Sequence, residues 1–129
     1  MAGLTPYVLV VEDDPKMATI VERCLQRASY ATEVATSGDQ ALWAVLNRSP
    51  IAIVLDVMIP HPSGIEVCKH LRREGWTGPI VIVSARSSPA DRDVALRAGA
   101  DAFMAKPFVL AELLATIEAL TSRSHRIDT

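Results

Sequence analysis

The sequence predicts an α/β fold, a doubly wound parallel sheet of five strands with five helices. Three of the expected strands are apolar at every position, which is typical of strands covered on both faces. Along the 129 residues, such runs alternate with segments whose apolar side chains recur every three or four positions, as in helices. Because the connections are short and crossovers are right-handed, we expect helices on both faces of one sheet.

The five strands are predicted from short runs that are rich in Val and Ile. The runs at 7–11, 51–55 and 80–83 are apolar throughout. The segment 31–35 alternates more between apolar and polar residues, and the segment 102–104 is very short, but both follow the same rhythm along the chain.

The five helices are predicted from apolar spacing and from residues that start or stop helices. Pro15 and Pro89 are placed for a first helical turn, and Ser37 and Ser63 for N-caps. Trp43, on the second helix, is expected to cover part of the core. Glycines after the third and fourth helices are expected to end them. The expected helices lie at 17–25, 41–46, 67–71, 94–98 and 110–120, and the two glycines are Gly75 and Gly99.

Composition excludes several classes of protein. Half of the residues are hydrophobic and the formal net charge is −2, which indicates one folded domain and argues against direct binding of nucleic acid. Cys24 and Cys68 lack CxxC spacing, so we expect two reduced thiols. The chain has no signal-peptide pattern and no apolar run near the roughly 20 residues of a membrane span, so we expect a cytoplasmic protein without membrane contact.

The chemistry is expected where the strands end. In open parallel sheets, ligands bind beyond the carboxyl ends of the strands. Three acidic residues follow the first expected strand, the third strand ends in an acidic residue, the fourth ends in a serine, and a lysine follows the fifth. These residues are Glu12, Asp13, Asp14, Asp56, Ser84 and Lys106.

The residue types at this edge suit transfer of a phosphoryl group. Crowded carboxylates repel one another unless a cation is present, and oxygen ligands suit Mg²⁺ or Mn²⁺ better than zinc. An aspartate beside such an ion, with Lys106 as a point charge and Ser84 as a hydrogen-bond donor, is equipped to accept a phosphoryl group.

Five short motifs occur in order along nearly the whole chain: residues 10–14 (VVEDD), 55–60 (LDVMIP, followed by Gly64), 83–85 (VSA), 99–101 (GAD) and 106–108 (KPF). Together they resemble the response-regulator receiver domain of two-component signal transduction, in the CheY-like superfamily. The resemblance implies a flavodoxin-like sheet with the strand order 2-1-3-4-5. It covers residues 1–122 as a receiver domain, with 123–129 as a polar tail or the start of a linker.

The resemblance also implies roles for the residues at the strand ends. Asp56 is similar to the phosphoacceptor that takes a phosphoryl group from a histidine-kinase phosphohistidine. Glu12 and Asp13 are similar to the acidic pair that organises Mg²⁺, with the backbone carbonyl of Met58 as a further ligand. Lys106 is similar to the phosphate-binding lysine, whose bond to the next proline is commonly cis. Asp14 lies one place beyond the acidic pair and is expected to be peripheral.

A switch is implied as well. Ser84 is similar to the switch hydroxyl, which would move to the phosphoryl group, and Phe103 is similar to the switch aromatic, which would then turn inward. The change would alter the face formed by the helix at 94–98, the strand at 102–104 and the helix at 110–120, which partners read. The implied partners are a sensor histidine kinase and a downstream effector domain or protein.

The last helix is similar to that of winged-helix transcription regulators, and this resemblance implies that the chain is the receiver half of such a regulator. In that subfamily this face forms homodimers through ion pairs. Arg92 and Glu112 have suitable charges for such pairs and Asp101 is in place, but Thr116 and Glu118 stand where basic residues are common.

Two other functions remain open. One is a degenerate receiver that acts only as a protein-interaction module. The other is a Mg²⁺-dependent aspartyl-phosphate phosphatase, but such enzymes need a second acid two residues after the nucleophile, where this chain has Met58. We therefore expect a signalling domain and not an enzyme, beyond self-catalysed phosphotransfer and dephosphorylation.

Overall fold

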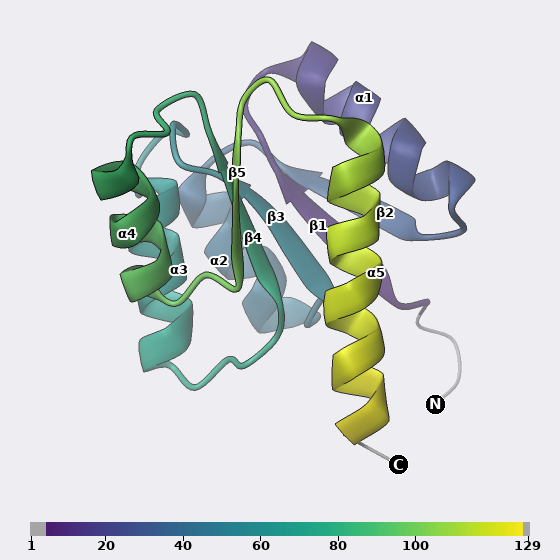
Figure 1. Ribbon diagram of the computed structural model, residues 1–129. Helices are drawn as coiled ribbons and strands as arrows, with labels where there is room; N and C mark the ends of the chain where they lie inside the picture. Colours follow the sequence, from purple (N-terminus) through teal and green to yellow (C-terminus); the bar gives the residue numbers. More distant parts are fainter. Residues whose placement is uncertain (1–4, 128–129) are drawn as a thin grey trace.

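The computed structural model describes residues 5–127 and has the predicted architecture (Figure 1). Five parallel strands lie in the order β2-β1-β3-β4-β5, which confirms the predicted strand order. Strands and helices alternate along the chain as β1 (Tyr7–Val11), α1 (Pro15–Arg27), β2 (Ala31–Ala35), α2 (Gly38–Asn47), β3 (Ala52–Asp56), α3 (Gly64–Arg73), β4 (Ile80–Ser84), α4 (Pro89–Ala98), β5 (Ala102–Ala105) and α5 (Leu110–Ile127).

Helices cover both faces of the sheet, and a separate apolar cluster fills each side. On one face, the sheet packs against α2, α3 and α4, with Val67 and Leu71 of α3 among the buried residues. On the other face it packs against α1 and α5, where Leu25 and Ile117 are fully buried. Figure 1 shows α1 and α5 together on one side of the sheet and the other three helices opposite them.

The burial of the strands explains their sequence patterns. Every residue of β1, β3 and β4 is buried, as predicted from their unbroken apolar runs. β2 lies at the edge of the sheet, and its Glu33 and Val34 are exposed. A strand that is covered less completely can carry polar residues, which accounts for its mixed sequence.

The predicted helix starts are confirmed. Pro15 begins α1, and the side chains of Ser37 and Ser63 accept hydrogen bonds from backbone N–H groups of α2 and α3. The two glycines after α3 and α4 have positive φ values of +88° and +115°. Only glycine adopts this conformation without strain, so both positions end a helix as expected.

Some boundaries and one burial prediction differ from the structure. β3 ends in Asp56 as predicted but begins at Ala52, β5 ends at Ala105 instead of residue 104, and α5 runs to Ile127 instead of ending at Leu120. Residues 128–129 of the expected tail lie outside the described residues, and the domain division at residue 122 stays a prediction. The expectation that Trp43 covers part of the core is wrong, because this residue is 68% exposed. Among residues 5–127, no helix combines the length and the apolar character that crossing a membrane requires.

Candidate functional site

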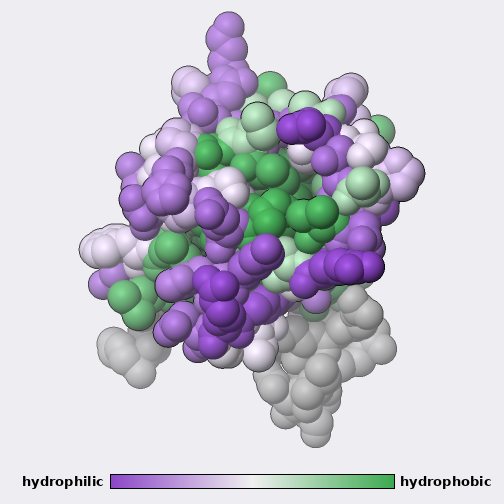
Figure 2. All heavy atoms as spheres, turned by 90° about the vertical axis from the view of Figure 1, so that its left-hand side faces the viewer, coloured by the Kyte–Doolittle hydropathy of each residue, from purple (hydrophilic) through white to green (hydrophobic). Residues whose placement is uncertain are grey.

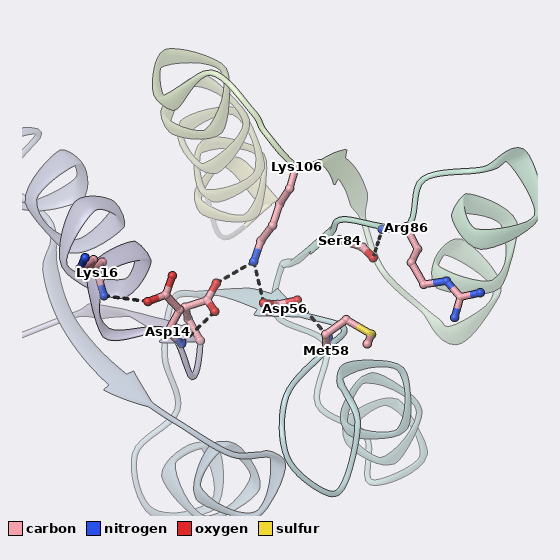
Figure 3. Close-up of polar contacts among 8 residues, drawn as sticks. Asp14, Lys16, Asp56, Met58, Ser84, Arg86 and Lys106 are labelled. Atoms are coloured by element: carbon pink, nitrogen blue, oxygen red, sulfur yellow. Dashed lines mark hydrogen bonds and ion pairs between the residues drawn. The ribbon is translucent and has the colours of Figure 1, made fainter.

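A lysine joins two buried carboxylates at the carboxyl edge of the sheet. Asp56 is the last residue of β3, and Glu12 directly follows β1. Their side chains are each only 5% exposed. Lys106, which follows β5, places its Nζ 2.7 Å from Asp56 Oδ2 and 3.0 Å from Glu12 Oε1. Figure 3 shows the Lys106 side chain reaching down from the end of β5 to Asp56.

Burial and neighbouring charges have opposite effects on the pKa values of Glu12 and Lys106. Burial raises the pKa of Glu12, and its contact with Lys106 offsets part of that effect. Burial alone would lower the pKa of Lys106, but its hydrogen bonds to Asp56 and Glu12 outweigh burial and raise it. The lysine therefore remains a cation at neutral pH, so the two carboxylates face a fixed positive charge.

A third carboxylate completes an acidic cluster. Glu12, Asp13 and Asp56 each offer one oxygen, and these oxygens lie within 4.8 Å of one another. Asp13 is exposed, whereas the other two are buried, so the cluster opens to solvent on the side of Asp13. One lysine cannot balance three carboxylates, and the donors are all oxygen. This set fits Mg²⁺ or Mn²⁺, as predicted from the sequence.

The loop after β3 is held close to the Asp56 carboxylate. The N–H of Met58 donates to Asp56 Oδ1 at 3.0 Å, while the Met58 side chain is 58% exposed. Gly64 begins α3 directly beneath, where a Cβ atom would lie 2.3 Å from the backbone oxygen of Asp56. Glycine is therefore needed for α3 to approach this strand. The role of the Met58 carbonyl as a metal ligand stays a prediction.

Ser84 lies beside this group but is hydrogen-bonded elsewhere. It ends β4, is 1% exposed, and its Oγ accepts a hydrogen bond from the N–H of Arg86 at 3.0 Å (Figure 3). Within the described part of the chain, no hydrogen bond joins Ser84 to Asp56. Asp14 accepts from the N–H of Lys16 at 3.1 Å and caps α1, which explains why this acid is peripheral to the site.

Phe103 and its surroundings lie farther along β5. Its ring is 7% exposed and packs in the cluster beneath α2, α3 and α4. The guanidinium carbon of Arg92 lies 5.2 Å from the centre of this ring. Asp101, expected as a dimer residue, instead pairs with Arg72 of α3 at 3.0 Å. The peptide bond between Lys106 and Pro107 is cis, as the resemblance implies.

The structure confirms that Pro89 begins α4, but sequence reasoning did not identify the cap in front of it. Ser88 accepts a hydrogen bond from the N–H of Asp91, and the Asp91 side chain accepts one from the N–H of Ser88. This reciprocal cap holds the loop that follows Ser84. The spacing of a serine and an acid three residues later was a usable signal in the sequence.

Comparison with known proteins identifies the family. A family model described as "Response regulator receiver domain" matches residues 8–118. The chain belongs to the response-regulator receiver family. "Response regulator MprA" of Mycobacterium sp. (strain KMS) is 44% identical to this receiver over 117 residues, which are 91% of this chain and 51% of the relative. The protein of the same name from Mycobacterium leprae (strain TN) is 44% identical over 121 residues, 94% of this chain and 53% of the relative. The receiver thus spans about half the length of these curated relatives.

Solved receivers have the same fold. The receiver domain of the Francisella response regulator 1452 superimposes with a TM-score of 0.90 at 32% identity, covering 93% of this chain and 99% of that one. The BeF₃-activated N-terminal receiver domain of Klebsiella pneumoniae RstA gives a TM-score of 0.84 at 30% identity, covering 89% of this chain and 97% of that one. The chain is therefore a receiver domain of a two-component response regulator, as its motifs predicted.

Proposed function

We propose that Asp56 accepts a phosphoryl group from the phosphohistidine of a sensor histidine kinase. The observation that carries this proposal is the placement of Lys106, which joins Asp56 and Glu12 at 2.7 and 3.0 Å. A buried carboxylate held beside a cation, at an edge that is open to solvent through Asp13, is suited to accept an anionic group. Family membership supports the same reading.

Transfer of the phosphoryl group to Asp56 needs little from the protein beyond correct positioning and positive charge. An oxygen of Asp56 forms a bond to phosphorus while the bond from phosphorus to the donor imidazole nitrogen breaks. The electron pair of that bond returns to the nitrogen, which takes a proton from solvent. Lys106 stays beside the product and donates to an oxygen of the phosphoryl group.

Glu12, Asp13 and Asp56 would hold Mg²⁺ or Mn²⁺, with the Met58 carbonyl as a further ligand. When bound, the ion supplies positive charge to the oxygens of the group in transfer. The oxygen-only donor set and the excess of carboxylates over lysine at this edge support this part of the proposal.

The phosphorylated site would be read on the face formed by α4, β5 and α5. Ser84 would exchange its bond from the Arg86 N–H for a hydrogen bond donated to the phosphoryl group, and the change would reach Phe103 on the neighbouring strand. A downstream effector domain or protein would bind the altered face. Pairing of two copies through this face stays a prediction.

Two alternatives have less support. A module that only binds proteins would not need a lysine between two buried carboxylates, because the cost of desolvating buried charges can exceed what their pairing returns. A phosphatase would need an acid at position 58, where the exposed Met58 has no proton to give. We therefore propose a signalling domain that turns over no separate substrate.

The proposal is tested by phosphorylation with a small-molecule phosphodonor such as acetyl phosphate. We expect labelling that requires Mg²⁺, stops with a chelator, and is lost in Asp56→Asn. Asp14→Asn is the matched control, since it removes a neighbouring acid while asparagine caps a helix as well as aspartate does. Undiminished labelling of Asp56→Asn would overturn the proposal.

A further inference from the structure

A cation from α4 lies over the buried aromatic ring of β5. Arg92 stands in the first turn of α4, and its guanidinium carbon is 5.2 Å from the centre of the Phe103 ring. A guanidinium within about 6 Å of a ring centre is attracted by the negative face of the ring. Phe103 is 7% exposed, so the contact is made with a side chain that is almost wholly buried.

The arginine reaches the ring from a well-held position. Its backbone N–H donates to the carbonyl of Ser88 at 3.0 Å, at a helix start that Ser88 and Asp91 cap reciprocally. Within the described residues, the side chain of Arg92 has no ion pair. Arg97, the other arginine of α4, instead pairs with Asp93 at 2.8 Å. The charge of Arg92 is therefore available to the ring, and that of Arg97 is not.

The ring and the switch hydroxyl lie on the same side of the sheet. In the pairing of β4 with β5, Phe103 is opposite Ile82 and Ala105 is opposite Ser84. Residues two apart along a strand point to the same face, so Phe103 and Ser84 share the face that α4 covers. A shift of Ser84 therefore changes the space that is available to the ring.

The surroundings of α4 are those of a surface that is open to partners. Figure 2 faces the side on which α3 and α4 lie, and it shows apolar side chains gathered in a hollow between hydrophilic ones. On α4 itself, Val94 and Leu96 are 48% and 44% exposed. Whatever sets the position of Phe103 therefore acts directly beneath an exposed, partly apolar helix.

We propose that Arg92 is a positioning residue for Phe103. Its guanidinium holds the ring in the buried position and thereby couples α4 to the Ser84 side of the phosphoryl site. The link to phosphorylation rests on the function proposed above, whereas the hold on the ring does not. If the contact has the strength of an exposed cation–π interaction, its loss changes the equilibrium between the buried and exposed positions of the ring by about two- to five-fold.

The ring position can be measured directly, because the chain has two phenylalanines. Fluorophenylalanine labelling gives two ¹⁹F signals, and Phe108→Leu assigns them. Without Mg²⁺ or any phosphoryl mimic, Arg92→Gln should move the Phe103 signal towards the solvent-exposed value. Arg92→Lys should restore much of the wild-type position, and Arg97→Gln, the matched control on the same helix, should leave it unchanged. An unmoved signal in Arg92→Gln, or equal shifts in the Gln and Lys variants, would overturn the proposal.

The coupling is tested by titration with beryllofluoride at saturating Mg²⁺. Arg92→Gln should weaken the apparent affinity for beryllofluoride by about two- to five-fold. The reason is that the conformation with the buried ring, which favours the bound state, is less populated in this variant. A ring that moves while the affinity stays at the wild-type value would refute the coupling. A wild-type chain that does not respond to beryllofluoride would instead count against the proposed phosphoacceptor function, and the ¹⁹F comparison would still decide the role of Arg92.

Discussion

Replacing Lys106 by methionine tests how the site is held together. Methionine keeps the length of the side chain and removes the charge that now lies 2.7 Å from Asp56 and 3.0 Å from Glu12. Both carboxylates are 5% exposed, so they lose their cation without gaining water. Breaking a buried ion pair costs ~3–5 kcal/mol, and the 20% exposure of Lys106 places this case at the lower end, about 3 kcal/mol.

A loss of that size is large against a typical stability of ~5–15 kcal/mol. With a urea slope of about 2 kcal/mol per molar, it lowers the midpoint of unfolding by roughly 1.5 M. Tryptophan fluorescence can follow the transition, because Trp43 and Trp76 lie outside the site. Lys69→Met is the matched control, since Lys69 is an exposed lysine of α3. The unfolding free energy of this variant should be within ~0.5 kcal/mol of the wild-type value.

A double-mutant cycle isolates the contact itself. The combination of Lys106→Met with Asp56→Asn should be less destabilising than the sum of the two single changes, with a coupling energy of ~1–3 kcal/mol. Added Mg²⁺ should stabilise Lys106→Met more than wild type, because the same carboxylates are left without a cation. Strict additivity, together with a loss below ~1 kcal/mol for Lys106→Met, would refute the account of a buried, lysine-held pair.

Three further predictions concern the scaffold. Gly38→Ala should lower the unfolding free energy by ~1–3 kcal/mol in urea titrations, because its Cβ atom would lie 2.0 Å from the Pro62 carbonyl oxygen. Arg72→Lys should cost ~2 kcal/mol by the same measurement, since lysine cannot reproduce a guanidinium that donates to three backbone carbonyls and to Asp101. Burial raises the pKa of Cys68 from 9.0 to about 11, so the unfolded chain loses this proton first. Stability should therefore be full below pH 9.0 and fall as the pH rises towards 11, and Cys68→Ala should lack this part of the slope.

The parts of the fold that depend on local pattern could be predicted. Unbroken apolar runs identified β1, β3 and β4, because only strands covered on both faces carry them. Since parallel strands end at one edge, the same reasoning brought Glu12, Asp56 and Lys106 together before any contact was known. The structure confirms that convergence with two hydrogen bonds from one ammonium group.

The degree of burial of individual residues, and the contacts between segments far apart in the sequence, could not be predicted in this way. The apolar spacing that predicted the helix at 41–46 includes Leu46, yet Leu46 is 86% exposed, because periodicity gives the direction of a helix face and not how far that face is covered. The contact of Arg92 with Phe103 joins two elements whose relative position depends on the packing of α4. The end of α5 was missed because no glycine or proline follows Leu120 to mark it.

The most direct test of the central claim is to locate the phosphoryl group on the chain. After reaction with a phosphodonor and Mg²⁺, reduction with borohydride and peptide mass spectrometry should place a single modification on Asp56. The signal should be absent without Mg²⁺ and in Asp56→Asn, and present in Asp14→Asn. A modification on another residue, or one that forms equally in the presence of a chelator, would contradict the account.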